Sequence, residues 1–232
     1  MQRIENAIPR GNTAPGVNRE IIESVRSVEP LHGGYTALDI PCGNGEFLDT
    51  LKVFFPVIET TGLDVKTPPD NFKHQFVQFD ASRNEAFPAA GPFDLITCIS
   101  GVMEFDNTSF FLSNLREVLK DDGLLIVTND NILTVRDRLL YLLFGRFGQF
   151  PFSTAAGNPT WKILPIQNLL RVLYDSGFNV EDVRYVPVSP AEWLWTPLAL
   201  VLFIAQRLYS PQGVLKEMVR KVFTFRSLVS RH

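Results

Sequence analysis

Cysteine and histidine are scarce in this chain. Its two cysteines are Cys42 and Cys98, and its three histidines are His32, His74 and His232. None of them stands in the spacing typical of a zinc site, and two cysteines are too few for a disulfide framework. We therefore expect no metal centre and no disulfide bond, and we assign both cysteines to packing.

Clustered positive charge is missing from most of the chain. The formal net charge is -3 and the isoelectric point is near 5.7, whereas a phosphate-binding surface needs grouped lysines and arginines. We expect no nucleic-acid partner. The first 16 residues also hold no apolar stretch of the kind that a signal peptide has, so we expect the protein in the cytoplasm.

A long apolar run is lacking too, although a short one exists. Residues 193–205 carry no charge, but a helix that spans a membrane needs about 20 residues. From Arg207 onward six basic residues stand against Glu217 alone. An apolar segment before a basic tail suits an anionic surface. We expect residues 193–209 to lie at the inner face of the membrane, as a peripheral anchor, or to be buried against the sheet of the domain or against a second copy of the chain.

Apolar residues make up 45% of the chain, which is enough for a large core. Short apolar segments alternate with helical patterns, which indicates a parallel sheet between two helical layers. We predict an α/β fold, Rossmann-like and doubly wound, with a mostly parallel sheet and helices on both faces. The expected strands are residues 36–40, 58–64, 75–79, 93–100, 123–128 and 179–186, and the expected helices are 18–28, 45–54, 108–119 and 165–176.

The sequence also predicts how the chain is organised into segments. Residues 1–17 form a loose leader, and residues 18–190 form one domain with an insertion at about 131–161. Residues 191–232 form an apolar helix and a basic tail. Asn18 stands where a helix cap is expected.

The most informative segment is ALDIPCGNGEF, at residues 37–47. An apolar strand ends in Asp39 and runs through Gly43 and Gly45 into a helix. Glycines let a backbone turn sharply and approach a ligand at the carboxyl edge of the sheet. A dinucleotide fingerprint would place a third glycine three positions after Gly45, where this chain has Leu48. An oxidoreductase that uses NAD is therefore the weaker reading.

The segment LDIPCGNGEF resembles the first motif of class I S-adenosylmethionine-dependent methyltransferases, with Pro41 in place of the first glycine of that motif. The resemblance implies a seven-stranded sheet, S-adenosylmethionine as cofactor, and a seventh strand near the C-terminal end. Residues 216–227 would supply that strand or would be helical.

The same resemblance assigns roles along the chain. Asp39, Gly43 and Gly45 would border the methionine half of the cofactor, and Asp64 would hold the ribose hydroxyls. The adenine amine would lie beside Asp80 and Ala81, and the segment SGVMEF, which begins with Ser100 and Gly101, would line the pocket.

Transfer of a methyl group to a hydroxyl calls for a base, because a hydroxyl is a poor nucleophile. His32 and His74 precede strands and so lie away from the carboxyl edge. Glu104 and Asp130 follow the fourth and fifth expected strands and are the candidate catalytic residues. Asn129 and Asn131 flank Asp130 and could orient an acceptor.

The layout resembles small bacterial methyltransferases of glycan, lipid and secondary-metabolite pathways, in which an insertion such as residues 131–161 forms a lid over the acceptor. We expect an O-methyltransferase that acts on a glycan or glycolipid precursor. A small-molecule methyltransferase of a natural-product pathway is the alternative, and a non-catalytic protein that keeps the fold as a scaffold is another. The [Asn/Asp]-Pro-Pro-Tyr signature of methyltransferases that act on nucleobases or glutamine is absent after the fourth expected strand.

Overall fold

The computed structural model describes residues 8, 13–27, 34–83, 85–88, 91–132, 134–147, 162–186, 197–198, 200–201, 204 and 226–229. Helices and strands alternate along these residues. In chain order they are α2 (Val17–Ser27), β1 (Thr36–Asp39), α3 (Glu46–Phe54), β2 (Glu59–Asp64), β3 (Gln75–Gln78), β4 (Phe93–Cys98), α4 (Thr108–Val118), β5 (Leu119–Asp130), α5 (Val135–Phe144), α6 (Ile166–Asp175), β6 (Val183–Val186) and β7 (Arg226–Val229).

The strands form one seven-stranded sheet in the order β3-β2-β1-β4-β5-β7-β6. The first five strands pair in parallel, and β7 runs antiparallel between β5 and β6. The chain order reverses between β1 and β4, and ligands of open α/β sheets bind outside such a switch point. The topology therefore predicts a site at the carboxyl ends of β1 and β4.

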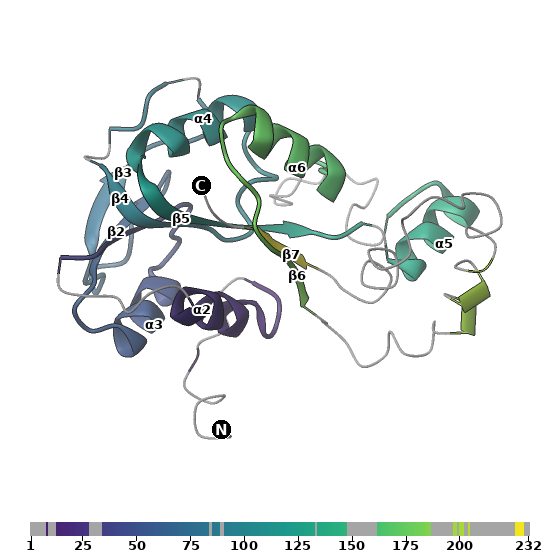
Figure 1. The fold of residues 1–232 in the computed structure, drawn as a ribbon, viewed down its shortest axis with the longest axis horizontal. Helices are drawn as coiled ribbons and strands as arrows, with labels where there is room; N and C mark the ends of the chain where they lie inside the picture. Colours follow the sequence, from purple (N-terminus) through teal and green to yellow (C-terminus); the bar gives the residue numbers. More distant parts are fainter. Residues whose placement is uncertain are drawn as a thin grey trace.

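Helices cover both faces of the sheet (Figure 1), with α4 and α6 on one side and α2 and α3 on the other. Alternate strand residues pack against the two helical layers, because successive side chains of a strand point to opposite faces of the sheet. In β5, for example, Leu125 and Val127 belong to the core under α4 and α6, whereas Leu124 and Ile126 belong to the core over α2 and α3.

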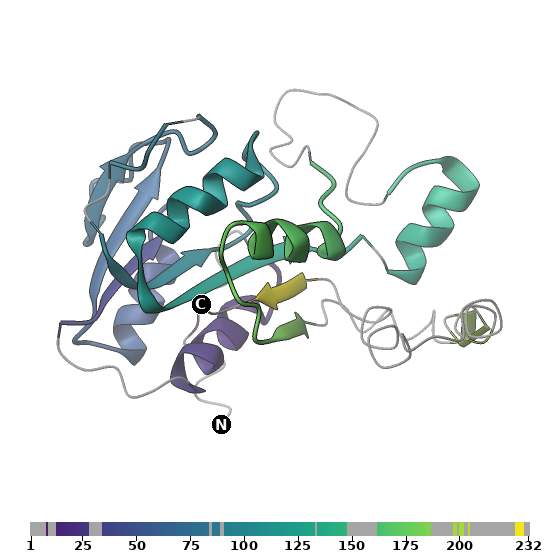
Figure 2. The same ribbon diagram turned by 45° about the horizontal axis from the view of Figure 1, so that its top comes forward.

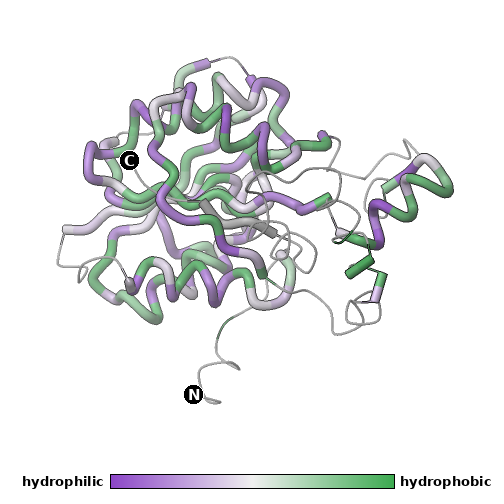
Figure 3. The backbone as a smooth tube through the Cα atoms, turned by 45° about the vertical axis from the view of Figure 1, so that its right-hand side comes forward, coloured by the Kyte–Doolittle hydropathy of each residue, from purple (hydrophilic) through white to green (hydrophobic). Residues whose placement is uncertain are grey.

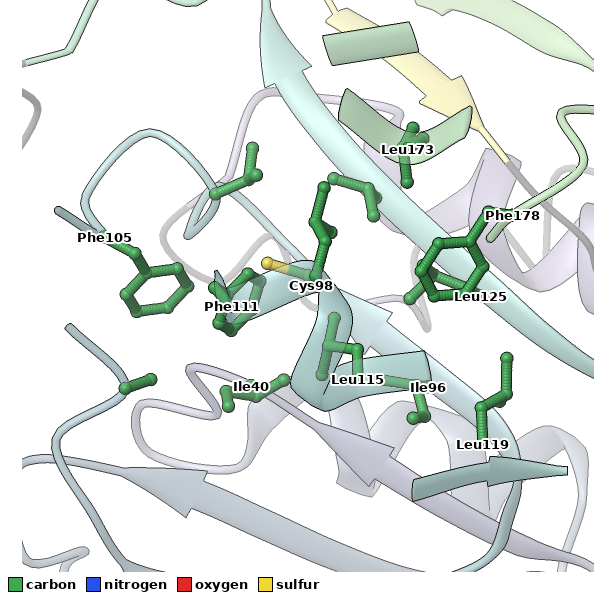
Figure 4. Close-up of a cluster of buried hydrophobic side chains, with 14 of the residues drawn as sticks. Ile40, Ile96, Cys98, Phe105, Phe111, Leu115, Leu119, Leu125, Leu173 and Phe178 are labelled. Atoms are coloured by element: carbon green, nitrogen blue, oxygen red, sulfur yellow. The ribbon is translucent and has the colours of Figure 1, made fainter. Parts of the chain in front are cut away.

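The core under α4 and α6 is the larger of the two and is rich in aromatic rings. Figure 4 shows Phe111 and Leu115 of α4 clustered with Ile96 and Cys98 of β4 and with Ile40, which follows β1. The central strands β1, β4 and the second half of β5 are thus buried on both faces, as is usual for the middle of a parallel sheet.

The predicted fold class is confirmed, and the structure refines its details. β5 is twice as long as the expected strand 123–128, because α4 ends at Val118 and the chain enters the sheet at once, with an irregular register opposite Phe93 and Leu95. Asn18 is not a helix cap. The helix already begins at Val17, and the Asn18 side chain is buried.

The C-terminal part of the chain returns to the sheet. The expected seventh strand near the C-terminal end is present: residues 226–229 form β7 between β5 and β6, at the end of the basic tail and overlapping the candidate range 216–227 only at its last two residues. Of the expected insertion at 131–161, α5 is the largest described part, and it stands away from the layered body in two views (Figures 1 and 2). Residues 148–161, like most of 193–209, lie outside the described residues.

Asp94 connects the beginnings of three strands, β1, β4 and β5, so its removal should destabilise the sheet. Its carboxylate accepts hydrogen bonds from the backbone and hydroxyl of Thr36 at 2.8 and 2.9 Å and from Nζ of Lys120 at 2.6 Å. Asp94→Ala should lower the free energy of unfolding by about 1.5–3 kcal/mol, the range for hydrogen bonds to a charged group. Urea denaturation at pH 7 measures this loss. Asp121→Ala is the control and should cost less, because Asp121 pairs with Arg116 on the exposed surface.

The loss of unfolding free energy in Asp94→Ala should depend on pH. Burial alone would raise the pKa of Asp94, but the hydrogen bonds from Lys120 and Thr36 outweigh it and hold the pKa below its usual value. The stabilisation is therefore complete above the ordinary pKa of an aspartate, about 4, and disappears as the pH falls through the lower folded-state pKa. A difference between wild type and Asp94→Ala that persists undiminished at the lowest pH would contradict this account.

Candidate functional site

A cavity of about 640 Å³ opens at the carboxyl edge of the sheet, at the switch point between β1 and β4. That volume is within the usual range for a small-molecule site, roughly 300–1,000 Å³. The segments that follow β1, β2, β3 and β4 and the last residue of β5 all contribute to its wall. The residues that line it are Thr13, Asn18, Asp39, Ile40, Pro41, Cys42, Gly43, Asn44, Glu46, Phe47, Leu63, Asp64, Val65, Lys66, Thr67, Phe79, Asp80, Ala81, Ser82, Ile99, Ser100, Met103, Glu104, Phe105 and Asp130.

Carboxylates dominate the charge of the cavity. Six acidic residues face a single basic one, Lys66, among the lining residues; the six are Asp39, Glu46, Asp64, Asp80, Glu104 and Asp130. Such a lining gives the cavity a negative potential, which favours a ligand with net positive charge. S-adenosylmethionine, with a sulfonium, an ammonium and one carboxylate, fits this requirement.

Asp39 ends β1 and is almost fully buried. Its Oδ1 accepts a hydrogen bond of 2.7 Å from the Thr97 hydroxyl of the neighbouring strand. Burial raises the pKa of Asp39 to about 7; the Thr97 hydrogen bond opposes this rise and the charge of Asp64 adds to it. A cation bound next to Asp39 would favour its ionised form.

Asp64 ends β2 and fixes the loop that follows β1. One carboxylate oxygen accepts from the backbone nitrogen of Gly43 at 2.9 Å, and the other accepts from that of Lys66 at 2.9 Å. An ionised carboxylate has about four lone-pair sites, so Asp64 keeps acceptor capacity for hydroxyl groups in the cavity. This is the chemistry that the ribose role requires.

Asp80 lines the cavity beyond β3 and also caps the turn that follows. It accepts from the backbone and hydroxyl of Ser82 at 3.1 and 2.6 Å and lies 3.3 Å from Nε of Arg83. The Ser82 hydroxyl is the largest influence and, against the opposing effect of burial, holds the pKa of Asp80 below its usual range. Asp80 therefore stays ionised, and Ala81 beside it forms part of the wall.

Two of the predicted glycines support the cavity without lining it. A Cβ on Gly45 would lie 2.6 Å from the ring of Phe72, and the φ angle of +82° also suits glycine alone. A Cβ on Gly101 would lie 2.1 Å from Cδ of Pro41. These glycines are required for packing against a ring and for the close approach of two loops, and neither requirement is visible in the sequence motif.

Ser100 lines the cavity in a left-handed conformation, with φ of +60°. Its backbone nitrogen donates to the Thr128 hydroxyl at 2.8 Å, and its own hydroxyl lies 3.3 Å from that of Thr13. Thr13 and Asn18 show that the N-terminal segment closes one side of the cavity. Neither residue was expected at the site, because the sequence pattern indicated a loose leader around Thr13 and a helix cap at Asn18.

The two candidate bases lie in the same cavity. Glu104 follows β4 and is half-buried, and Asp130 ends β5. Asn129 points elsewhere: its Nδ2 donates to the carbonyl of Leu164 at 2.6 Å, and it is not part of the cavity wall. Asn131 is buried and is also outside the wall.

The cysteines and the described histidine do not build a reactive site. Burial raises the pKa of both thiols, so Cys42 and Cys98 remain protonated. His74 is buried below the cavity, where its Nδ1 lies 2.8 Å from the Thr60 hydroxyl. Burial lowers its pKa, against the opposing charge of Asp49. Among the described residues no group of three or more histidine, cysteine or acidic side chains is arranged to hold a metal ion.

A sequence model of the family described as "Methyltransferase domain" matches residues 15–183, more than half of the chain. The chain belongs to this methyltransferase family. Together with the fold, the match makes the protein a class I enzyme whose cofactor is S-adenosylmethionine. The match ends before β7, the strand that completes the sheet.

Solved structures of similar fold come from several kinds of methyltransferase. An S-adenosylmethionine-dependent methyltransferase from Mesorhizobium loti has a TM-score of 0.54 at 16% identity, over 90% of this chain and 96% of that one. A mycolic acid cyclopropane synthase complexed with S-adenosylhomocysteine has 0.57 at 15%, over 91% and 82%. A 1,6-didemethyltoxoflavin-N1-methyltransferase from Burkholderia thailandensis has 0.55 at 12%, over 99% and 79%. No curated protein sequence matches the methyltransferase.

The ribose role of Asp64 can be tested directly. If Asp64 holds the ribose hydroxyls, Asp64→Ala should weaken the binding of S-adenosylhomocysteine to the methyltransferase by about 1.5–3 kcal/mol, the range for hydrogen bonds to a charged group. Isothermal titration calorimetry measures the change. Asp70→Ala removes an exposed carboxylate a few residues away and should leave the affinity unchanged. Unaltered affinity in a folded Asp64→Ala protein would show that Asp64 is not the ribose ligand.

Proposed function

We propose that the protein transfers the methyl group of S-adenosylmethionine to a hydroxyl of a glycan or glycolipid precursor. The observation that carries the proposal is the convergence of Glu104 and Asp130, which follow the adjacent strands β4 and β5 and line one cavity. A sugar hydroxyl must lose a proton as its oxygen takes the methyl group, and a carboxylate within reach can accept that proton.

Glu104 is the better suited of the two to act as a base. Burial raises its pKa, and the charge of Asp64 adds to the rise. A general base is most effective when its pKa lies near the working pH. The cavity would thus supply both a cofactor half, around Asp39 and Asp64, and a proton acceptor for the incoming hydroxyl.

The surroundings of β5 support an amphipathic acceptor. β5 leads from Asp130 toward α5, whose second half is apolar and exposed, and Leu200, Val201 and Ile204 are exposed apolar residues as well. We propose that the insertion at 131–161 serves the acceptor side, although none of residues 134–147 lines the cavity in this structure. The mycolic acid cyclopropane synthase, by its name, modifies a lipid on the same fold, which is compatible with a lipid-linked acceptor here.

A small heterocycle is the second candidate acceptor. The Burkholderia thailandensis neighbour, whose name gives 1,6-didemethyltoxoflavin as its acceptor, covers 99% of this chain with the same fold. A screen with labelled S-adenosylmethionine against cell extract, divided into lipid-linked and soluble pools, distinguishes the two acceptors. Label in the lipid-linked pool supports the glycolipid, and label in small soluble compounds supports the alternative. A protein that binds the cofactor and labels neither pool would indicate a scaffold.

The proposed acceptor also indicates the cellular location of the enzyme. We propose a cytoplasmic enzyme that acts at the inner face of the membrane. No helix within the described part of the chain is long and apolar enough to cross a membrane. The described residues of 193–209 include Leu200, Val201 and Ile204, which are all exposed. That this segment contacts a membrane or a second copy of the chain stays a prediction.

Charge removal at the two candidate bases tests the mechanism. Glu104→Gln and Asp130→Asn preserve shape and remove the proton acceptor. The variant that lacks the base should lose about 10²-fold or more in kcat while its affinity for S-adenosylhomocysteine stays intact. Steady-state kinetics on the labelled acceptor and calorimetry measure the two quantities. Full activity in both variants would mean that neither carboxylate is the base.

The pH profile identifies which carboxylate acts. A base works only when it is deprotonated, so kcat/KM should rise with pH until the pKa of the base is passed. Because the pKa of Glu104 is raised, this rise should occur at higher pH than for an ordinary glutamate if Glu104 is the base. The rise should vanish in Glu104→Gln and persist in Asp130→Asn.

A further inference from the structure

The second half of α5 is an unusual surface for a folded protein. Tyr141, Leu142, Leu143 and Phe144, which we call the apolar tip, are between 57% and 78% exposed. Seven of the twelve large apolar side chains that the described residues expose lie either in this tip or in residues 200–204. The exposure is therefore concentrated in one region, and a patch of this kind marks an interaction site.

The first turn of α5 is firmly held, so the exposure of its end has a defined geometry. The Thr134 side chain accepts from the backbone nitrogen of Asp137 at 3.1 Å, and its hydroxyl donates to the Asp137 carboxylate at 2.6 Å. Val135 is buried. Beyond this anchored turn the remaining six residues of α5 extend for about 9 Å, and the helix stands away from the layered body (Figure 1).

The distribution of the tip around the helix indicates what covers it. Successive residues of an α-helix are about 100° apart, so four consecutive exposed side chains cover its whole circumference. A folded partner buries one side of such a helix and leaves the others in water. Lipid surrounds an inserted helix end on every side and leaves no apolar face in water.

A second apolar segment lies on the same side of the molecule. Leu200, Val201 and Ile204 are 51–60% exposed. In all three whole-molecule views the short pieces that contain them stand beyond the sheet on the α5 side, and Figure 3 shows apolar colour on both α5 and these pieces. Two apolar elements at one end of the molecule enlarge the surface that a membrane could receive.

The charges around the tip favour an anionic surface. Arg136 and Arg146, on either side of the tip, are exposed. The acidic residue of α5, Asp137, is buried against Thr134. The exposed charge of this helix is thus positive, and a twofold contact between copies would bring like charges together. Anionic headgroups attract such residues, each by about 1 kcal/mol near a membrane surface.

We propose that the apolar tip of α5 inserts into the interface of an anionic lipid membrane. A helix of 10 residues is half the length needed to span a bilayer, so it would lie within the headgroup and upper acyl region. Because α5 follows Asp130 by only a few residues, insertion brings the acceptor side of the cavity to the lipid surface. This last step rests on the proposed function and makes the acceptor a lipid-linked molecule presented by the membrane.

Vesicle sedimentation tests the insertion, with neither cofactor nor acceptor present. The protein should pellet with phosphatidylglycerol vesicles at low salt and less with phosphatidylcholine vesicles or at 0.5 M salt. The double variant Leu142→Ser/Leu143→Ser should lose at least tenfold in affinity for phosphatidylglycerol vesicles. The matched control, Val53→Ser/Val57→Ser, removes two exposed apolar side chains at α3 and the loop after it and should bind like wild type.

Two further measurements keep the test decisive. Unchanged calorimetric affinity for S-adenosylhomocysteine shows that the tip variant is folded. In an otherwise intact protein, Phe144→Trp should show a blue shift of its fluorescence on phosphatidylglycerol vesicles that exceeds the shift of the wild type, whose own tryptophans are Trp161, Trp193 and Trp195. Wild-type binding by the tip variant, the absence of this larger blue shift, or a dimer in solution that ignores vesicles and is dissociated by Leu142→Ser/Leu143→Ser would overturn the proposal.

The rate of methyl transfer tests whether the acceptor is presented by the membrane, independently of vesicle binding. With the lipid-linked pool as acceptor, the tip variant should transfer methyl groups at least tenfold more slowly than the control variant, and detergent solubilisation of that pool should remove the difference. Equal transfer by both variants on intact membranes would overturn the lipid-presented acceptor. Failure of methyl transfer altogether would refute the proposed function and leave the vesicle result standing.

Discussion

The carboxylate of Asp64 holds together the site on which the other features depend. By accepting from Gly43 and from Lys66 it joins the loop after β1 to the end of β2. Neighbouring parallel strands bring their carboxyl ends to one edge, but loops at that edge need such bonds to keep a defined shape. The negative charge that fixes the loop also faces the cavity, so one residue both shapes the site and selects a cationic ligand.

The excess of buried carboxylates has a thermodynamic consequence. The pKa of Asp39 is raised to about 7 by burial, with the Thr97 hydrogen bond opposing and the Asp64 charge adding to the rise. The folded state therefore holds a proton on Asp39 that the unfolded chain releases near pH 4, so the contribution of Asp39 to stability falls as the pH rises from about 4 to 7. A cationic ligand beside Asp39 favours the ionised form. The arrangement makes the protein alone less stable at neutral pH and makes cofactor binding more favourable there.

Much of the fold and of the cofactor half could be predicted from the sequence, because both depend on local patterns. The apolar strand before Asp39 and the placement of Asp64 and Asp80 at strand ends follow from residue order. The packing of Gly101 against Pro41 and the burial of Asn18 in the cavity depend on contacts between segments distant in sequence. A seventh strand near the C-terminal end was expected from the resemblance, but its position at residues 226–229 was hard to foresee, since four residues in a basic tail carry little strand signal without the edge of β5 beside them.

The two halves of the site differ in how the chain stabilises them. Around Asp39 and Asp64 the wall is tied together by hydrogen bonds, from Thr97 to Asp39 and from Gly43 and Lys66 to Asp64. Beyond Asp130 the chain leaves the core, and α5 keeps only its first turn anchored by Thr134, Asp137 and Val135. Exposed leucines gain no free energy from burial, and isolated short helices are marginal in water. Their presence at the end of α5 thus calls for an apolar environment outside the fold, and lipid can provide it at the edge where the acceptor must enter.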